Sequence, residues 1–421
     1  MKNKKGRDSS SHESDSKRIA KIIMEQQEEK EDPFLFKLPP ERIAQNPIDS
    51  DPNWRDEARL MVLHRDSGKI EHRRFKDIVE YFGEGDLFVM NDTKVVPTLL
   101  KAKSRFDISV VLLREINHAD RIWEASITVV PSRQDGKIEP DIILNFETEP
   151  PLRAKVLHKT ANQIFTLQFQ FDGTNEDFRK ALSEYAMPYL PQWVKPLPTT
   201  ADKVNYQTIF AKAEGAISAP GAGLHFSPQL FLKMEVKGIR KSFLTLHTGI
   251  GHFRTALVRT KTPQGWKVAK NQPPSSDTKK KSWAWSNMNQ EWLWMDSEHL
   301  IIDAEAAADI NRAKQRGGRV VAIGASVIRG LETAPRVDGD ILSFDGWTGE
   351  FIRPTTPPFS FHVTDAIVSN FHLPKSPSLM CVAAFGGYER VMSAYKEAIA
   401  YKEGNRKGYR FGPYGDAMLI L

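Results

Sequence analysis

The stretch that most constrains the fold runs from residue 215 to residue 255 (GAISAPGAGLHFSPQLFLKMEVKGIRKSFLTLHTGIGHFRT). Its first nine residues are too rich in glycine, alanine and proline for a regular element, and they suit a tight turn or the close approach of a ligand. Ser227 and Pro228 predict a helix start, because serine caps free N–H groups and proline fits the first helical position. Gly238 ends that helix, and residues 242–247 (SFLTLH) predict a strand.

Two histidines lie at the ends of these elements, beside glycine-containing loops: His225 and His247. Binding sites in α/β sheets form at strand ends and in the loops that follow them. The spacing alone has a simpler interpretation, in which two ordinary turns carry two structurally satisfied histidines. The residues around them must therefore decide between these two interpretations.

Composition excludes several classes of protein. The chain has 421 residues, 40% of them hydrophobic, which is enough for two or three packed domains. The single cysteine, Cys381, excludes an intrachain disulfide and a thiolate metal cluster, and the eleven histidines show no metal-ligand spacing, so we expect no metal. No apolar run is long enough to span a bilayer, and the charged N-terminus lacks a signal core, so we expect a cytoplasmic protein without membrane contact. The net charge of +6 permits binding to a polyanion without requiring it.

Changes in composition and hydrophobic pattern along the chain predict the domain organisation. Residues 1–32 mix basic and acidic side chains with few apolar ones and predict a disordered tail. Residues 33–98 and 186–421 predict the two parts of one α/β domain, with a weakly patterned, tryptophan-containing insertion at 260–294. Between them, residues 99–185 hold short β-rich runs and one final helix. The runs lie at 108–113, 122–130, 142–146, 154–157 and 165–171, which is the pattern of a small antiparallel barrel.

Several long motifs carry a resemblance to one enzyme family. Residues 36–47 (FKLPPERIAQNP), 91–97 (NDTKVVP) and 206–211 (YQTIFA) match its opening half. Residues 219–226 (APGAGLHF), 245–247 (TLH), 365–374 (DAIVSNFHLP) and 409–418 (YRFGPYGDAM) match its second half, in the same order. The chain resembles the S-adenosylmethionine:tRNA ribosyltransferase-isomerases of queuosine biosynthesis, from about residue 34 to residue 421.

The resemblance implies a fold and a function. The expected fold is an α/β domain with a mixed sheet and an inserted small antiparallel β-barrel. The expected reaction transfers the ribosyl part of S-adenosylmethionine to a 7-aminomethyl-7-deazaguanine base in the tRNA anticodon. The enzyme isomerises the ribosyl group to give epoxyqueuosine and releases adenine and methionine. The implied partners are tRNA and S-adenosylmethionine, the latter as a substrate, and we expect a monomer.

The motifs also indicate site residues, most of them at predicted strand ends. An imidazole titrates near neutral pH, so the candidate bases and acids are His225, His247 and His372, with Asp92 and Glu332 as groups that orient them or bind substrate. Thr93, Asn370 and Asp416 are candidate substrate contacts. Arg59, Arg254 and Arg329 could hold a carboxylate or a phosphate through paired hydrogen bonds. For each residue the alternative is a buried polar side chain with a structural role.

Several positions depart from the family patterns. The loop after the strand at 320–323 reads GASVIRGLE (324–332) where the family reads GTTSVRTLE. Gly221 stands for a threonine, Thr255 for a proline, and residues 295–298 (MDSE) for MHSE. The basic R-P-G-K motif of the barrel appears only as residues 130–133 (VPSR), and the opening D-x-S-R as residues 56–59 (DEAR). Lost hydroxyls predict weaker binding of S-adenosylmethionine than a complete motif would give.

Two alternatives therefore stay open beside the family enzyme. One is a divergent paralogue that uses S-adenosylmethionine on another deazapurine. The other is a non-catalytic RNA-binding relative that kept the fold.

Overall fold

The computed structural model describes residues 33–47, 54–103, 107–130, 138–161, 163–191, 193–194, 197–249, 259–262, 265–268, 281–286, 291–355, 357–403 and 406–421. The predicted tail at 1–32 and the candidate Arg254 lie outside the described residues. None of the helices in the described ranges is both long and apolar enough to cross a membrane.

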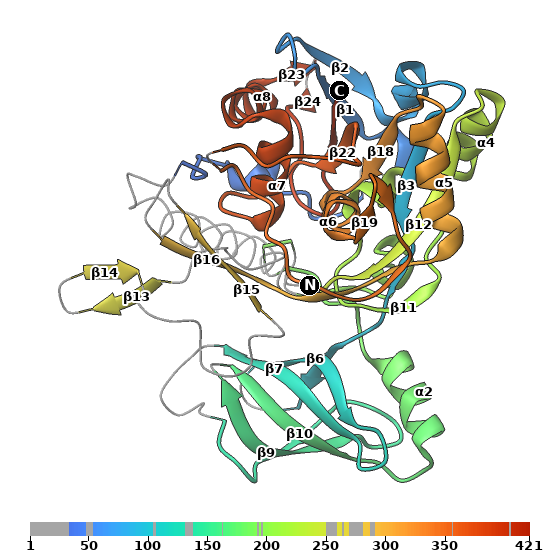
Figure 1. Cartoon of the computed structure of the whole chain (residues 1–421). Helices are drawn as coiled ribbons and strands as arrows, with labels where there is room; N and C mark the ends of the chain where they lie inside the picture. The colour runs from blue at the N-terminus through green and yellow to red at the C-terminus, as the bar shows by residue number, and fades with distance from the viewer. Residues whose placement is uncertain are drawn as a thin grey trace, which may run out of the picture.

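A nine-stranded mixed sheet forms the centre of the larger domain (Figure 1). Its order is β2-β1-β25-β22-β18-β3-β12-β17-β21. The bounds are β1 Arg59–Leu63, β2 Ile70–Arg74, β3 Leu87–Asn91, β12 Arg240–His247, β17 Glu298–Ile302, β18 Val320–Ile323, β21 Phe344–Thr348, β22 Ala366–Asn370 and β25 Ala417–Ile420. Strands β22, β18, β3 and β12 run parallel, whereas β25 and β17 run antiparallel to their neighbours β22 and β12. The carboxyl ends of the four parallel strands therefore meet at one edge of the sheet.

Helices pack on both faces of this sheet. Because successive strand residues point to opposite faces, Leu87 and Val89 of β3 join one core cluster, while Phe88 and Met90 join the other. The first cluster includes residues of α5 (Ala304–Gln315), α6 (Ala325–Thr333), α7 (Pro377–Gly386) and α8 (Tyr388–Ala400). The second includes residues of η3 (Phe75–Tyr81) and α4 (Pro228–Val236).

A separate six-stranded antiparallel sheet follows β4 (Thr93–Val95) and lies below the larger domain in Figure 1. Its order is β5-β6-β7-β10-β9-β8, with bounds β5 Leu99–Ala102, β6 Asp107–Asn117, β7 Ile122–Val130, β8 Ile143–Asn145, β9 Arg153–Ala161 and β10 Ile164–Gln170. A bridge between Ala102 and Phe146 nearly closes it, and Phe178 and Leu182 of α2 (Asn175–Tyr185) pack into its own core. The predicted fold class is confirmed: a mixed-sheet α/β domain with an inserted barrel-like sheet.

The local signals in the sequence act as expected. The Ser227 side chain accepts a hydrogen bond from the Leu230 N–H at the start of α4, and Asp303 does the same for Ala306 at the start of α5. The remaining short elements are η1 Pro40–Arg42, η2 Trp54–Glu57, α3 Asp202–Asn205, β19 Arg336–Val337, β20 Asp340–Ile341, β23 Lys402–Glu403 and β24 Arg406–Lys407.

Two segments hold more structure than the sequence predicts. The glycine-rich stretch begins within a strand, β11 (Ala213–Ala216), which pairs with β4, and it contains a 3-10 turn, η5 (Gly221–His225). Backbone groups make this pairing, so it leaves no side-chain pattern to detect. The predicted insertion at 260–294 contains a hairpin, β13 (Arg259–Thr262) with β14 (Gly265–Val268), and most of a second one, β15 (Lys281–Ser286) with β16 (Glu291–Asp296).

Candidate functional site

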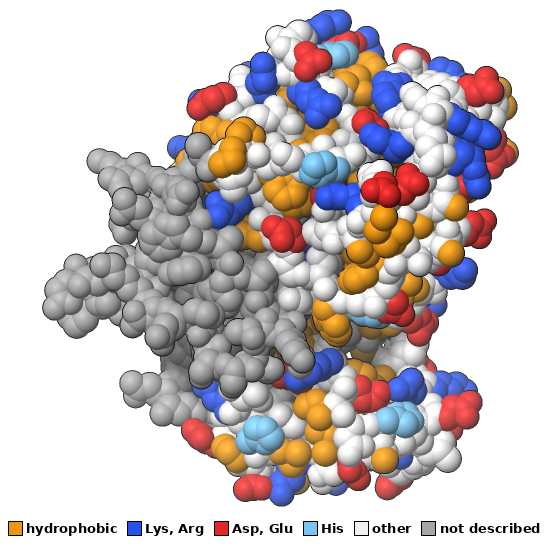
Figure 2. All heavy atoms as spheres, viewed as in Figure 1, with side chains coloured by type: hydrophobic (Ala, Val, Ile, Leu, Met, Phe, Trp, Pro, Cys, Tyr) orange, Lys and Arg blue, Asp and Glu red, His pale blue; other side chains and the backbone are white. Residues whose placement is uncertain are grey.

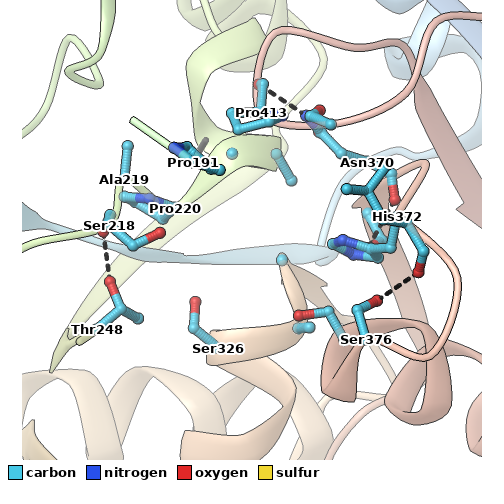
Figure 3. Close-up of a pocket in the computed structure, with 18 of the residues that line it drawn as sticks. Pro191, Ser218, Ala219, Pro220, Thr248, Ser326, Asn370, His372, Ser376 and Pro413 are labelled. Atoms are coloured by element: carbon cyan, nitrogen blue, oxygen red, sulfur yellow. Dashed lines mark hydrogen bonds between the residues drawn. The ribbon is translucent and has the colours of Figure 1, made fainter. Parts of the chain in front are cut away.

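A cavity lies where the parallel strands β22 and β18 end, next to the segment that follows β12 (Figure 3). Ser369, Asn370 and His372 reach it from the end of β22, and residues 324–326 reach it from the end of β18. The other lining residues come from the 191–222 segment, from Thr248 and from the loops around α7 and β25. The full lining comprises Pro191, Trp193, Tyr206, Ser218, Ala219, Pro220, Gly221, Ala222, Thr248, Gly324, Ala325, Ser326, Ser369, Asn370, His372, Leu373, Ser376, Ser378, Gly412 and Pro413. Motifs far apart in the chain thus converge on one hollow, as expected for an α/β sheet.

His372 is the one predicted histidine that lines this cavity. Its ring lies across the hollow from Ser218 and Thr248 in Figure 3. Its Nε2 is 2.7 Å from the Ser369 hydroxyl, and its backbone N–H donates to the Tyr395 hydroxyl at 3.0 Å. These contacts fix the ring at the cavity wall, in a position where it could exchange a proton with a bound molecule.

Asn370 lines the cavity, and His225 lies buried behind it. The Asn370 amide donates to the carbonyls of Gly412 and Pro413, and its Oδ1 is 3.1 Å from His225 Nε2. His225 is 1% exposed, and its Nδ1 is 3.3 Å from the Arg55 carbonyl. Burial lowers the pKa of His225 to about 4, so this ring is neutral at physiological pH. His225 thus contacts Asn370 and does not itself line the cavity.

The buried His225 predicts a pH dependence of stability. Its ordinary pKa of 6.5 falls to about 4 on folding, because burial penalises the charged ring. The stabilisation from the neutral ring is therefore complete above pH 6.5 and is lost as the pH falls toward 4. At about 1.4 kcal/mol per pKa unit, the free energy of unfolding should drop by about 3 kcal/mol across that range. Urea unfolding between pH 7.5 and 4.5 measures it, and a His225→Gln variant with the same slope as wild type would contradict the assignment.

His247 belongs to a second group, beside the cavity. Its Nδ1 is 2.8 Å from the Thr93 hydroxyl, and a Cβ at Gly215 would lie only 2.7 Å from the same nitrogen. Gly215 has a φ of +152°, a backbone conformation that residues with a side chain rarely adopt. Both this conformation and the short distance to His247 exclude a side chain at residue 215. Desolvation, and then His299, lower the pKa of His247, while Asp92 opposes that shift. Asp92 itself accepts a hydrogen bond from the Thr245 hydroxyl at 2.5 Å.

Thr248, the residue after His247, joins the cavity to a buried ion pair. Its hydroxyl donates to the Ser218 carbonyl, a bond drawn in Figure 3, and the next N–H, of Gly249, donates to Glu298 at 2.9 Å. The other carboxylate oxygen of Glu298 accepts from Arg329 of α6, and both side chains are 3% exposed. Arg329 is therefore linked through Glu298 to the segment that contains Thr248, which lines the cavity. Arg329 does not itself line the cavity.

The altered segment 324–332 is not the expected loop: after Gly324 it forms helix α6, and it meets the cavity only at its start. Gly324, with a φ of +103°, precedes α6, and Ala325 and Ser326 line the hollow. Gly330, which replaces a family threonine, faces the core instead: a Cβ there would lie 3.0 Å from Leu300 and 3.1 Å from Leu244. Of the departures in this segment, only those at Ala325 and Ser326 line the cavity.

Three other predicted residues lie outside the cavity lining, and each makes hydrogen bonds within the protein. Asp416 is fully buried and accepts from the backbone N–H groups of Arg59 and Arg410, at 2.9 and 2.8 Å. The Arg59 guanidinium donates to Glu403 and to the Gly408 carbonyl. Glu332 accepts from the backbone N–H groups of residues 362–364. Their geometry supports structural roles: Arg59 and Asp416 tie β1 to the chain end, and Glu332 anchors the loop before β22.

Several residues that line the cavity were not predicted from the sequence, among them Tyr206, Ser218, Thr248, Ser369 and Ser376. Tyr206 lies in the motif at 206–211, and Ser369 lies in the motif at 365–374 beside Asn370 and His372. Their positions within family motifs were the signal that could have identified them. Glu298 was visible only as the last residue of the altered MDSE motif. Within the described residues, no group of three or more histidine, cysteine, aspartate or glutamate side chains is arranged to hold a metal ion.

Comparison with known proteins decides the family. The family model described as queuosine biosynthesis protein matches residues 31–268 and 285–420. The chain belongs to this family. It is 42% identical over 391 residues to the S-adenosylmethionine:tRNA ribosyltransferase-isomerase of Phocaeicola vulgatus, covering 92% of this chain and 98% of that one. The enzyme of the same name from Bacteroides fragilis is 43% identical over 392 residues, with the same coverage.

Among solved structures, the chain is similar to the S-adenosylmethionine tRNA ribosyltransferase of Thermotoga maritima. That likeness has 31% sequence identity and a TM-score of 0.47, and it covers 93% of this chain and all of the other.

Proposed function

We propose that this chain is an S-adenosylmethionine-dependent tRNA ribosyltransferase-isomerase that makes epoxyqueuosine. Family membership over nearly the whole chain supports this function. The observation that carries the site assignment is the convergence of the family motifs on one cavity, with His372 and Asn370 in its wall. The relatives named for this activity act on tRNA, and we propose tRNA as the partner of this chain, in the cytoplasm. The monomeric state stays a prediction.

We assign S-adenosylmethionine to the cavity from the chemistry of its lining. Tyr206 and Trp193 supply aromatic faces, which attract a cationic sulfonium. Ala325, the first residue of α6, and Ser378, the second residue of α7, lie at helix N-termini whose dipoles favour the methionine carboxylate. Asn370 has both amide N–H groups on backbone carbonyls, so only the second lone pair of its Oδ1 could accept from the adenine amine or a ribose hydroxyl. Each of these groups complements a different part of one molecule that is both cationic and anionic.

His372 is our candidate for the general base. A carbon next to a sulfonium is acidic, because the positive sulfur stabilises the neighbouring carbanion. His372 would accept that proton from the ribosyl 5′ carbon. The electron pair would form a C4′–C5′ double bond as the C4′–O4′ bond breaks, and O4′ would form a carbonyl with C1′ as adenine leaves and takes up a proton. The amine of the tRNA base supplies the nucleophile. We propose His247, held by Thr93, as a group at the rim where the tRNA base approaches, and Asp92 as the carboxylate that counters a charge on that ring.

Product analysis tests this function. The protein is incubated with S-adenosylmethionine and tRNA that carries the 7-aminomethyl base, and the digested nucleosides are analysed by mass spectrometry. Epoxyqueuosine together with released adenine and methionine is the expected result. Adenine without modified tRNA would support a paralogue with another acceptor, and RNA binding without turnover would support a non-catalytic relative.

The start of α6 predicts a gain of affinity. Ala325 lines the cavity where the family has a threonine, so Ala325→Thr should restore one hydroxyl to the substrate. A hydrogen bond of this kind contributes about 0.5–1.5 kcal/mol, which corresponds to roughly 2–10-fold tighter binding of S-adenosylmethionine. Calorimetric titration measures this affinity. Gly330→Thr is the contrasting variant, because its added side chain would lie against Leu300 and Leu244 in the core and not in the cavity, so it should leave the affinity unimproved.

A further inference from the structure

Three ring side chains form a row across the outer end of the main sheet: His247 on β12, His299 on β17 and Trp347 on β21. His247 is the direct register partner of His299, which is in turn the partner of Trp347. Directly opposed residues point to the same face of a sheet, so the three rings share one face. The ring centroids are 6.0 Å apart for the two histidines, at an interplanar angle of 22°, and 5.6 Å apart for His299 and Trp347.

This ring row is accessible to solvent at its outer end. Trp347 is 61% exposed, and it is the most exposed phenylalanine, tyrosine or tryptophan whose burial the structure describes. The residues that alternate with the row, Leu246 and Leu300, are fully buried on the other face. A lone exposed apolar side chain needs no explanation, but a continuous row of rings on an open sheet face resembles a stacking surface.

The inner end of the ring row meets the proposed active site. His247 bonds to Thr93, and the next residue along β12, Thr248, lines the cavity. The His299 ring is held by Asp345, whose carboxylate is 2.7 Å from its Nε2. Two lysines flank this end: Lys94, whose ammonium is paired with Glu214 at 2.9 Å, and the exposed Lys212, which precedes Ala213, the ladder partner of Thr93. The rings therefore lie next to the hollow, together with one exposed lysine.

We propose that the ring row stacks on unpaired bases of the tRNA anticodon loop that flank the base entering the cavity. This proposal rests on the proposed function, because the acceptor base must arrive at the same rim. Basic and acidic side chains are interspersed over the described surface that Figure 2 shows. Electrostatic attraction on that face therefore contributes little to RNA binding. Stacking on aromatic faces supplies the contact that charge does not, and an open sheet face suits single-stranded bases.

Binding of an unmodified anticodon stem-loop RNA to the full chain tests this surface. Trp347→Ala should weaken RNA binding by about 10-fold, since base–aromatic stacking has that magnitude. Trp347→Phe keeps a ring and should stay within about 3-fold of wild type. The matched control is Leu232→Ala, because Leu232 is 62% exposed and lies on α4 away from the row. Calorimetry should give wild-type affinity for S-adenosylmethionine in all three variants.

The proposal would be overturned if Trp347→Ala bound the stem-loop RNA as tightly as wild type does. It would also be overturned if the wild-type protein did not bind the stem-loop RNA. Sedimentation that shows a dimer lost in Trp347→Ala would overturn it too, because the face would then hold a second copy of the chain. The product assay separates the two ideas. If Trp347→Ala still forms epoxyqueuosine with an unchanged KM for tRNA, the result contradicts the role of the ring row but not the proposed function. If wild type binds RNA in a way that depends on Trp347 but forms no product, the result contradicts only the proposed function.

Discussion

Replacement of His372 by alanine is expected to lower kcat for epoxyqueuosine formation by about 10²–10⁴-fold, the usual contribution of a positioned general base. His372 lines the cavity. Its ring contacts the Ser369 hydroxyl, and its backbone N–H donates to the Tyr395 hydroxyl. Because the substitution removes a proton acceptor and leaves the rest of the lining intact, the affinity for S-adenosylmethionine should change by less than about 10-fold.

Single-turnover kinetics with calorimetry measure both effects. The matched control is His158→Ala, since His158 lies on β9 of the inserted sheet and contacts Thr166 there. It should keep the wild-type kcat. A kcat for His372→Ala within a few-fold of wild type would show that another group accepts the proton, and His247 would then be the next candidate.

Arg329→Ala is expected to destabilise the fold by about 3–5 kcal/mol. Its guanidinium and the Glu298 carboxylate form a pair that is 3% exposed on each side, and removal of one partner leaves a buried charge without its counter-ion. Glu298→Ala should cost a similar amount and should also release the Gly249 N–H, which bonds to the same carboxylate. Denaturant unfolding measures the loss in both variants.

A double replacement distinguishes this account from a direct role in substrate binding. Arg329→Met with Glu298→Leu removes both charges and should recover most of the stability, because a well-packed apolar pair can substitute for a buried ion pair. Binding of S-adenosylmethionine should recover along with the fold. A stable double variant that has lost the ligand would instead place Arg329 in contact with it.

Much of the fold was predictable because its signals are local. The cap at Ser227 and the buried strand that ends just before Gly324 each depend on neighbouring residues, and the structure places elements there. The barrel-like sheet was predictable from its short, turn-separated runs. Strands β17, β21 and β22 were not predicted, because their hydrophobic patterns are brief and their pairing partners lie far away in the sequence.

The motifs predicted which segments meet at the cavity, but not which of their side chains line it. His225, Asn370 and His372 look alike in a sequence as polar residues near strand ends. Their roles separate only through burial, which hides His225 behind Asn370 and brings His372 to the cavity wall. The same holds for Arg329, whose partner Glu298 is 31 residues away along the chain. No local pattern reports such pairings.

The most direct test of the central claim is a crystal structure of the protein with S-adenosylmethionine bound. Ligand density should fill the cavity between Ser218 and Thr248 on one side and His372 on the other, with the methionine carboxylate near Ala325 or Ser378. The ribosyl 5′ carbon should lie within about 3.5 Å of a His372 ring nitrogen, as a reacting pair requires. Density at another place in the molecule, or a ribosyl group that faces away from His372, would contradict the assignment of this cavity as the active site.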